Sequence, residues 1–425
     1  MRIFKYIGDY IIAFCLVLSS NTVYQTELGV NANVFRLGLT LLVVFTCLLT
    51  LLLMVASGHQ TGVPTTSEVT TMCILYVPIL AILFGHLTYF VNTPSRLLQF
   101  LLLFFLFVPV IWVYMVNLGY QRLISAYINI VVVISAISLF FWFFASLLKL
   151  VYPTGSVVST WGAVPNILPK YYNLYFETQN TRLMGESFIR NSGIFTEAPA
   201  YAFTLSLAFL SELLLKQTKS YFKILILAIT LFSTLTSTGF LILFLTMMAI
   251  GIAYLTSNQS LVSIMSILVI FIVGLIITLP NIWNLISDKS GTLSTAIRAD
   301  DYIAGIKSWL TAPLLGHGFL NMAALSPFMN TAIRVEYSLH GSVVNTGIAN
   351  GWTSILSDGG LTLVLYYSFL LLFPIIDGKQ KKVKIFFCCL LFMTFIVVLE
   401  YLYVFLFFLM MGLVMCYQES NIPDD

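Results

Sequence analysis

Residues 97–116 have the sequence LLQFLLLFFLFVPVIWVYMV, which contains no charged side chain. A helix of about 20 such residues rises roughly 30 Å, which is the thickness of the hydrocarbon core of a bilayer. Similar apolar runs recur along the chain, in which 59% of residues are hydrophobic and 9% are charged. Soluble domains carry about a quarter charged residues. The sequence therefore predicts an all-α integral membrane protein, with a single polytopic membrane domain over residues 1–425.

Apolar runs of about 17 to 25 residues divide the chain into about 12 predicted transmembrane helices. The run 222–256 is divided in two, because about 35 residues exceed one crossing and Ser237-Thr238-Gly239 offers a break. The first run follows Arg2 and Lys5 and resembles a signal peptide, but no convincing cleavage site follows it, so we expect a retained span. The predicted spans are 4–20, 36–56, 69–91, 97–116, 124–149, 194–215, 222–237, 239–256, 261–279, 352–374, 384–399 and 402–417.

Lysines gather in two short loops between predicted spans, at 216–223 and at 379–384. The positive-inside rule places such loops in the cytoplasm. With an even number of spans, both termini are then cytoplasmic, and two long polar segments, about 150–193 and 280–351, emerge on the outer face. An odd number of spans would separate the two lysine loops. The chemistry is expected in the two outer segments, because they are the only long polar stretches in the sequence.

The composition of these segments argues against several kinds of site. All six cysteines fall in apolar spans, so neither a disulfide framework nor a cysteine metal site is indicated. No zinc-ligand spacing and no acidic pair of the DxD type is found, so the sequence does not support metal-dependent activation. No nucleotide-binding motif is seen. We therefore expect no metal, no cofactor and no nucleic acid partner.

Two arginines of the outer segments suggest an anion site. Arg190 stands shortly before the apolar run that starts near Ile194, so it is predicted at the membrane surface beside a helix N-terminus, where free backbone N–H groups favour anions. Arg298 precedes Asp300 and Asp301, and its alternative is a local salt bridge. Two rigid guanidinium forks suit the oxygens of a pyrophosphate. The alternative for any one of these charges is a solvated loop side chain.

Candidates for a proton acceptor lie in the same segments. Glu197 is seven positions after Arg190, which would place both on one face of a shared helix; it is either a general base or a stabiliser of the helix N-terminus. His317 and His340 are the histidines predicted on the outer face, and either one would suit proton transfer or simply be solvated. Asp9 and His86 fall inside apolar spans, and we assign them no role.

The second outer segment is long enough to fold. Its residues 299–310 have the pattern of an amphipathic helix, with Tyr302, Ile306, Trp309 and Leu310 on one stripe. Such a helix is expected to lie on the membrane surface. Pro313 ends it, and a tight turn follows at Gly316-His317-Gly318.

The motifs of the two outer segments, taken together, resemble the O-antigen polymerase and ligase superfamily. The resemblance runs from Arg182 to Leu361 and depends on the order and spacing of its elements rather than on any one of them. The elements are Arg190-Asn-Ser-Gly193-Ile-Phe195-Thr-Glu197-Ala-Pro199, Ser237-Thr238-Gly239, Arg298, Pro313-Leu-Leu-Gly316-His-Gly318, and Asn350 ten residues before Gly360-Leu361.

Within this superfamily the chain resembles the Wzy-type polymerases. The spacing Arg182-x10-Gly193 fits the repeated motif of that family, but the second copy is missing, because Trp309 rather than glycine follows eleven residues after Arg298. The related ligases carry histidine immediately before the asparagine of the last motif. This chain has Ala349 there, which weakens the interpretation as a ligase and leaves the catalytic base open.

The resemblance implies a membrane glycosyltransferase of the GT-C type, in the bacterial cytoplasmic (inner) membrane. It would join undecaprenyl-pyrophosphate-linked oligosaccharide repeat units into a surface polysaccharide at the outer face, without a metal. Arg190 and Arg298 would stabilise the departing pyrophosphate, Arg182 would hold the phosphate of the second lipid, and Asn350 would orient a sugar hydroxyl. The base stays open among three residues: His340, Glu197 and His317.

Other functions remain as alternatives. A ligase would share nearly all of these features and would differ in its acceptor, a lipid A core or a protein. A transporter of lipid-linked oligosaccharides would need paired halves with interrupted helices, and no internal repeat is found. A purely structural scaffold would not need clustered arginines. The expected partners are lipid-linked oligosaccharides and membrane lipid, while the sequence leaves open whether a chain-length regulator protein binds and whether the product is O-antigen or capsule.

Overall fold

The computed structural model describes residues 2–26, 32–57, 65–88, 94–159, 166–183, 186–246, 293–338, 341–345, 347–348, 350–395, 397–398 and 401–420. This part of the chain is mostly helical. Six of its helices are long and apolar enough to cross a membrane: Val34–Ala56, Thr66–Thr88, Pro94–Leu118, Tyr120–Leu147, Ala198–Leu215 and Gly351–Ile376. The expectation of a membrane protein is supported. The count of about 12 crossings stays a prediction, and the expected span 261–279 lies outside the described residues.

The helices follow the apolar runs closely. Their bounds are α1 (Arg2–Leu18), α2 (Val23–Thr26), α3 (Ala32–Ala56), α4 (Thr66–Thr88), α5 (Pro94–Phe100), α6 (Val108–Leu118), α7 (Tyr120–Phe141), α8 (Ala198–Leu210), α9 (Tyr221–Ser233), α12 (Leu293–Thr311), α13 (Met322–Leu325), α14 (Thr331–Arg334), α15 (Gly351–Ile376), α16 (Lys381–Thr394) and α17 (Tyr403–Ser420). π-helical turns link or extend several of them: η1 (Leu101–Phe107), η2 (Trp142–Leu147) and η3 (Ser211–Leu215).

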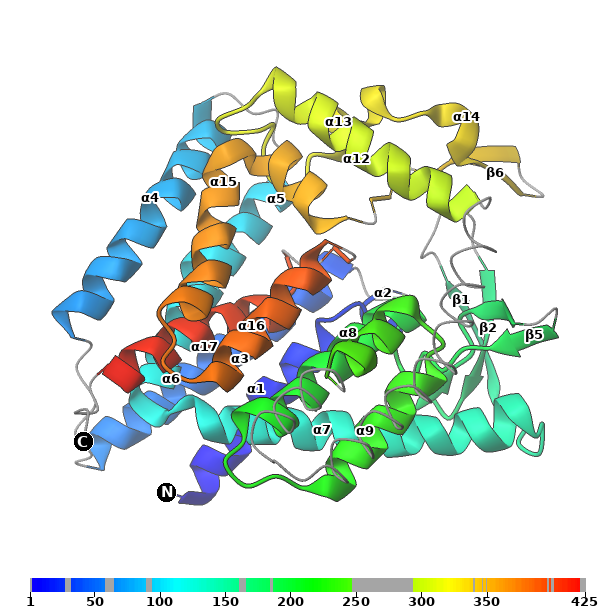
Figure 1. Ribbon diagram of the computed structural model, residues 1–425, viewed down its shortest axis with the longest axis horizontal. Helices are drawn as coiled ribbons and strands as arrows, with labels where there is room; N and C mark the ends of the chain where they lie inside the picture. Colours follow the sequence, from blue (N-terminus) through cyan, green and yellow to red (C-terminus); the bar gives the residue numbers. More distant parts are fainter. Residues whose placement is uncertain are drawn as a thin grey trace, which may run out of the picture.

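The core of the bundle forms around α17, whose residues 404–416 are all buried. A helix that is apolar on every side is stable when other helices surround it. α17 contacts α1, α6 and α15, while α1 packs on α3 and α7, and α15 also packs on α4 and α16. α12 packs against α15 and runs along the top of the view in Figure 1.

The two lysine loops lie at the same end of the molecule. Partial burial and the nearby charge of Lys382 together lower the pKa of Lys219, so the α8–α9 and α15–α16 loops approach one another. The start of α1 and the end of α17 lie toward the lower left in Figure 1, away from α12. The two lysine loops therefore lie close together, as the sequence predicts. That this end of the molecule faces the cytoplasm stays a prediction.

The segment between η2 and α8 forms strands, so the expectation of an all-α protein does not hold outside the apolar helices. β1 (Gly155–Ser159), β2 (Asn166–Tyr171) and β3 (Tyr175–Phe176) make an antiparallel sheet, and β4 (Asn180–Leu183) pairs antiparallel with β5 (Glu186–Ile189). A further antiparallel pair lies after α14 and consists of β6 (Val335–Ser338) and β7 (Gly341–Val344). Val157 and Leu168 face each other in the register and are buried between more exposed neighbours. This alternation is the period of a half-buried strand.

The predicted amphipathic helix 299–310 is confirmed as part of α12. Its small residues face the bundle: Ala304 is buried, and a Cβ added at Gly305 would lie 2.4 Å from the Cβ of Thr353 in α15. The apolar side chains of Tyr302 and Ile306 are exposed on the other side. Leu310 of the predicted stripe is exposed as well, but Trp309 is half-buried and the Tyr302 hydroxyl donates to the carbonyl of Phe395 at 3.0 Å. The stripe is therefore only partly turned away from the protein, and its contact with lipid stays a prediction.

We predict that residues 155–182 and 291–341 face outward and that the lysine loops 216–223 and 379–384 face the cytoplasm. Ser156 and Gln217 are both exposed and suit single cysteine substitutions. In spheroplasts, a membrane-impermeant thiol reagent should label Ser156→Cys, while Gln217→Cys should react only after the membrane is permeabilised. The parent protein controls for the native cysteines. Labelling of Gln217→Cys in sealed spheroplasts would contradict the predicted orientation.

Candidate functional site

A break in α15 joins the outer segment to the bundle. At Gly360 the backbone has φ 56° and ψ −151°, a conformation that side chains with a Cβ essentially never adopt. The next two N–H groups leave the helical pattern and donate to the loop after α12: Leu361 N–H to the carbonyl of Pro313 at 2.9 Å, and Thr362 N–H to that of Leu314 at 3.1 Å. The loop thus supplies acceptors that a broken membrane helix would otherwise lack.

The same loop also satisfies carbonyl groups on the other side of the break. The N–H groups of His317 and Gly318 donate to the carbonyls of Ser357 and Asp358, at 2.8 and 2.9 Å. The backbones approach closely enough that a Cβ on Gly316 would lie 2.5 Å from the carbonyl carbon of Asp358. The glycines of the motif therefore permit docking of this loop on α15.

The side chain of Asp358 extends this junction. Its Oδ2 accepts a hydrogen bond from the N–H of Leu320 at 2.8 Å, and the Tyr401 hydroxyl donates to the same oxygen. The ring of Tyr401 also packs edge-on against Phe319, with the ring centroids 4.5 Å apart. A buried carboxylate is stable only with such donors, so Asp358 fixes the chain that leaves the docked loop.

His317, one of the three candidate bases, is attached to the end of α12. Its Nε2 lies 2.9 Å from the hydroxyl oxygen of Thr311 and 3.0 Å from the carbonyl oxygen of Ser308. A carbonyl can only accept, so Nε2 carries the hydrogen in the contact with Ser308. The imidazole therefore helps to end α12 before the docked loop, which is a positioning role that the sequence did not indicate.

Arg190 lies beside the N-terminus of α8. Its Nε donates to the carbonyl of Thr234 at 3.1 Å, and its Nη1 donates to Oε1 of Gln179 at 3.3 Å. The same Gln179 oxygen accepts from the N–H of Ala198, the first residue of α8, at 3.1 Å. One amide oxygen therefore holds the guanidinium against the helix end, where the helix dipole favours negative charge.

The expectation that Arg190 and Glu197 share a helical face is wrong. α8 begins at Ala198, with Glu197 as an extended N-cap residue (φ −149°, ψ 150°). The chain before it turns at Gly193, which has φ +57° and packs against the ring of Tyr201. Pro199 in the first turn also favours a helix start at this point.

Arg190, Glu197 and Arg298 are nevertheless brought within electrostatic reach of one another. Burial lowers the pKa of Arg190 to about 10; the negative charge of Glu197 opposes this shift, and the positive charge of Arg298 adds to it. In the part of the chain that the structure describes, neither arginine forms an ion pair with a carboxylate. The guanidinium of Arg190 thus lies beside the N-terminus of α8, and the charge of Arg298, from the other polar segment, acts on it. Two guanidinium groups whose charges interact suit a bound anion.

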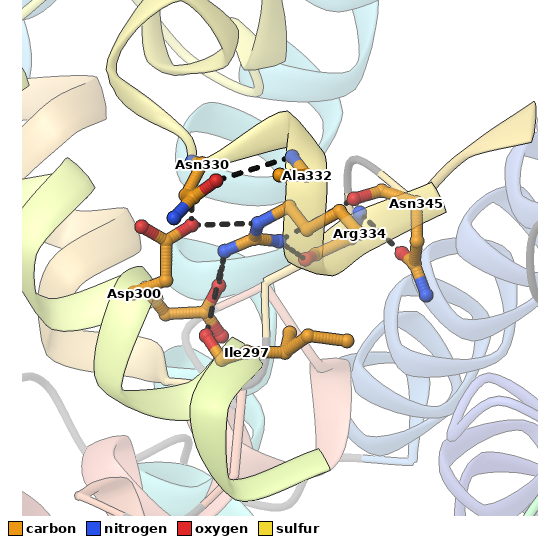
Figure 2. A network of polar contacts seen from close by, with 8 residues as sticks. Ile297, Asp300, Asn330, Ala332, Arg334 and Asn345 are labelled. Atoms are coloured by element: carbon orange, nitrogen blue, oxygen red, sulfur yellow. Dashed lines mark hydrogen bonds and ion pairs between the residues drawn. The ribbon is translucent and has the colours of Figure 1, made fainter. Parts of the chain in front are cut away.

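The local salt bridge considered for Arg298 is not formed. Asp300 and Asp301 instead bind Arg334, whose side chain is 0% exposed (Figure 2). Arg334 Nε lies 2.7 Å from Oδ2 of Asp300, and its Nη2 donates to Oδ1 of Asp301. Arg334 could not be identified from the sequence, because nothing near it in the chain indicates partners more than thirty positions away.

Asn350 is the N-cap of α15. Its Oδ1 accepts from the N–H of Thr353 at 3.2 Å, and its Nδ2 donates to the carbonyl of Phe395 at 3.1 Å. The side chain is buried, and both ends of its amide are engaged in holding the helix start. These contacts explain the asparagine without a sugar hydroxyl. Its proposed contact with substrate would use the second amide hydrogen or the second lone pair of Oδ1.

The structure gives less information on two further candidate residues, Arg182 and His340. Arg182 lies in β4, opposite Ser187 of β5, in the hairpin that leads to Arg190. His340 lies outside the described residues. The structure therefore brings together Arg190, Glu197 and Arg298, whereas the roles of Arg182 and His340 stay predictions.

The ionisable groups inside the apolar spans have partners within the bundle. Asp9 in α1 accepts from the hydroxyl of Tyr114 at 2.7 Å and pairs with Arg122 at 2.8 Å. His86 in α4 accepts at Nε2 from the N–H of Phe319 at 3.1 Å. The contacts of Asp9 join α1 to α6 and α7, and that of His86 joins α4 to the segment before α13. These structural contacts account for costly ionisable residues in apolar helices without a part in the reaction.

A family model described as O-Antigen ligase matches residues 222–368. This range holds Arg298, the docked loop, Asn350 and the break in α15. The match supports the O-antigen ligase and polymerase superfamily and does not single out a polymerase. A search among curated proteins found no match.

Gly360→Ala should destabilise the protein by roughly 1 to 3 kcal/mol, because alanine is strained at this backbone conformation. Its Cβ would also lie 2.6 Å from the carbonyl oxygen of Pro313, so the docked loop must shift. The thermal midpoint of the purified protein in detergent measures the effect. Gly38→Ala is the matched control, since a Cβ there meets nothing within 4 Å. Equal midpoints for the two variants would refute the role of the break.

Proposed function

We propose that this protein is a polymerase that joins lipid-pyrophosphate-linked oligosaccharide repeat units by glycosyl transfer. The O-Antigen ligase match supports a membrane enzyme of the ligase or polymerase kind, and six long apolar helices suggest a membrane protein. The observation that carries the proposal is the approach of Arg190 and Arg298 at the N-terminus of α8. A departing lipid pyrophosphate has the charge and the paired oxygens that such a site would bind.

In the proposed reaction, a hydroxyl of one lipid-linked unit attacks the anomeric carbon of the growing glycan on another lipid. The new carbon–oxygen bond forms as the bond from the anomeric carbon to the pyrophosphate oxygen breaks. The hydroxyl proton passes to a base, and the pyrophosphate keeps the electron pair. Arg190 and Arg298 stabilise the charge that develops on it, a role otherwise given to a metal ion, so the proposed transfer is metal-independent.

Glu197 is the base that the arrangement favours among the three candidates. Its charge acts on Arg190, so it lies beside the proposed leaving group. His317, by contrast, uses Nε2 to hold the end of α12. His340 stays a candidate, as do Arg182 for the phosphate of the second lipid and Asn350 for a sugar hydroxyl.

The site is proposed to act at the outer face of the bacterial inner membrane. The lysine loops lie together at the end of the molecule away from α12, and the positive-inside rule assigns such an end to the cytoplasm. Both termini would then be cytoplasmic. The proposed partners are undecaprenyl-pyrophosphate-linked oligosaccharides and membrane lipid, and a chain-length regulator protein is a further candidate.

A ligase is the second candidate function, favoured by the printed description of the matching family. Its leaving group is the same, and only its acceptor differs. A transporter fits less well: α15 is interrupted at Gly360, but backbone of the docked loop fills the break instead of leaving it open toward a pathway.

Deletion of the gene, followed by gel display of surface polysaccharide, tests the proposed function. Loss of a polymerase should leave single repeat units on the acceptor, because the unit is still transferred but not extended. Loss of a ligase should leave the acceptor without any unit. A normal ladder in the deletion strain would rule out both activities under the growth conditions used, and complementation with the intact gene controls for effects on neighbouring genes.

Arg190→Ala and Arg298→Ala should each abolish chain extension, because a lost donor to a developing oxyanion costs on the order of 10²–10³ in rate. Replacement by Lys should rescue only in part, since an ammonium lacks the planar fork. Lys170→Ala and Lys307→Ala remove the same charge from the same outer segments and should be nearly silent. Gel ladders are compared at equal protein level in the membrane. A wild-type ladder from both arginine variants would return these residues to solvated loop charges.

A further inference from the structure

The guanidinium of Arg334 bonds to groups from two separate parts of the polar segment. Besides the carboxylates of Asp300 and Asp301, its Nη1 donates to the carbonyl of Gly347 at 3.1 Å and to that of Asn345 at 3.4 Å (Figure 2). The guanidinium thus ties α12 to both ends of the β6–β7 hairpin. It also holds two carboxylates that lie immediately after Arg298 in the sequence.

The geometry of α12 makes Asp301 a natural partner for Arg298. Residues three apart on a helix are surface neighbours, whereas residues two apart face different sides. Arg298 and Asp301 are three apart, and Asp300 is two away. In the structure Asp301 is fully buried toward Arg334, while Arg298 is exposed and its charge acts on Arg190. The Asp301 carboxylate is therefore bonded to Arg334, although its spacing from Arg298 along the helix would also allow a pair with Arg298.

We propose that Arg334 is a positioning residue that holds Asp301 away from Arg298 and thereby keeps the Arg298 guanidinium available to a pyrophosphate. The inference rests on the anion site of the proposed function. Without Arg334, the Asp301 carboxylate would lose its buried partner and turn to its neighbour on the helix. Arg298 would then be neutralised before an anion arrives.

The chemistry of arginine suits this task. Its fork reaches two carboxylates at once with directed hydrogen bonds, which an ammonium does not reproduce. Burial disfavours the charge of Arg334, but the hydrogen bonds to Asp301 and Asp300 outweigh it and raise the pKa. The cation is therefore permanent, and the carboxylates stay committed to it.

Binding of inorganic pyrophosphate to the purified full-length protein in detergent, measured by calorimetry, tests this inference. Arg334→Met should weaken binding on the order of tenfold, about the worth of one charge-assisted hydrogen bond. Adding Asp301→Asn should restore most of the affinity, since the competing charge is gone. Adding Asp300→Asn instead should not, although it removes an equal buried charge. A purely structural role of Arg334 would respond alike to both, so the difference isolates the effect on Arg298.

Three controls complete the series. Arg298→Ala sets the background, Lys307→Met should bind like the wild type, and the folded fraction is taken from gel filtration. If Arg334→Met does not fold, Arg334→Lys serves in its place, with a smaller loss that Asp301→Asn again reverses. Equal rescue by both asparagine variants, unchanged affinity in the Arg334 variants, or wild-type binding no better than Arg298→Ala would each overturn the inference. The binding series is independent of the acceptor, so a failed polymerase phenotype leaves its result intact.

Discussion

The backbone junction between the loop 313–318 and the broken helix α15 supports the rest of the outer segment. In hydrocarbon an unpaired N–H or carbonyl costs several kcal/mol, so a membrane helix can break only where other groups replace its hydrogen bonds. Here two N–H groups after Gly360 and two carbonyls before it find partners in a single loop. Because that loop directly follows α12, the junction also determines where α12 lies over the bundle, and hence where Arg298 is held.

Charge pairing determines which arginines of the two polar segments remain available to an anionic ligand. Arg334 is fully buried and takes both carboxylates of α12, and Gln179 holds Arg190 at the start of α8 without neutralising it. The carboxylates are therefore unevenly distributed among the arginines. Arg334 forms ion pairs with two of them, whereas the positive charge of Arg298 acts on Arg190. Two like charges in proximity are unfavourable in the absence of an anion. The carboxylate of Glu197 compensates part of this charge at Arg190, and the bound anion that we propose would compensate the rest.

Sequence reasoning succeeded where a property depends on a local stretch. The amphipathic pattern of 299–310 predicted α12, and most expected spans coincide with helices, because apolar periodicity is carried by adjacent residues. The predictions from sequence failed where contacts between distant segments determine the structure. The start of α8 at Ala198 removed the helix that Arg190 and Glu197 were expected to share, yet the turn at Gly193 still brings the two charges together. The strands of 155–189 were missed because each is short and only alternates in burial once its partners are in place.

The sequence by itself predicted a helical membrane protein and showed two short lysine-rich loops and two arginine-bearing polar segments. Hydropathy and charge are sums over neighbouring residues, so they need no knowledge of the fold. Only the tertiary structure decided that Asp301 belongs to Arg334, that His317 and Asn350 hold helix ends, and that Arg298 reaches Arg190. Each of these depends on a distance between segments far apart in the chain, and electrostatic and hydrogen-bonding energies act over a few ångströms of space rather than along the sequence.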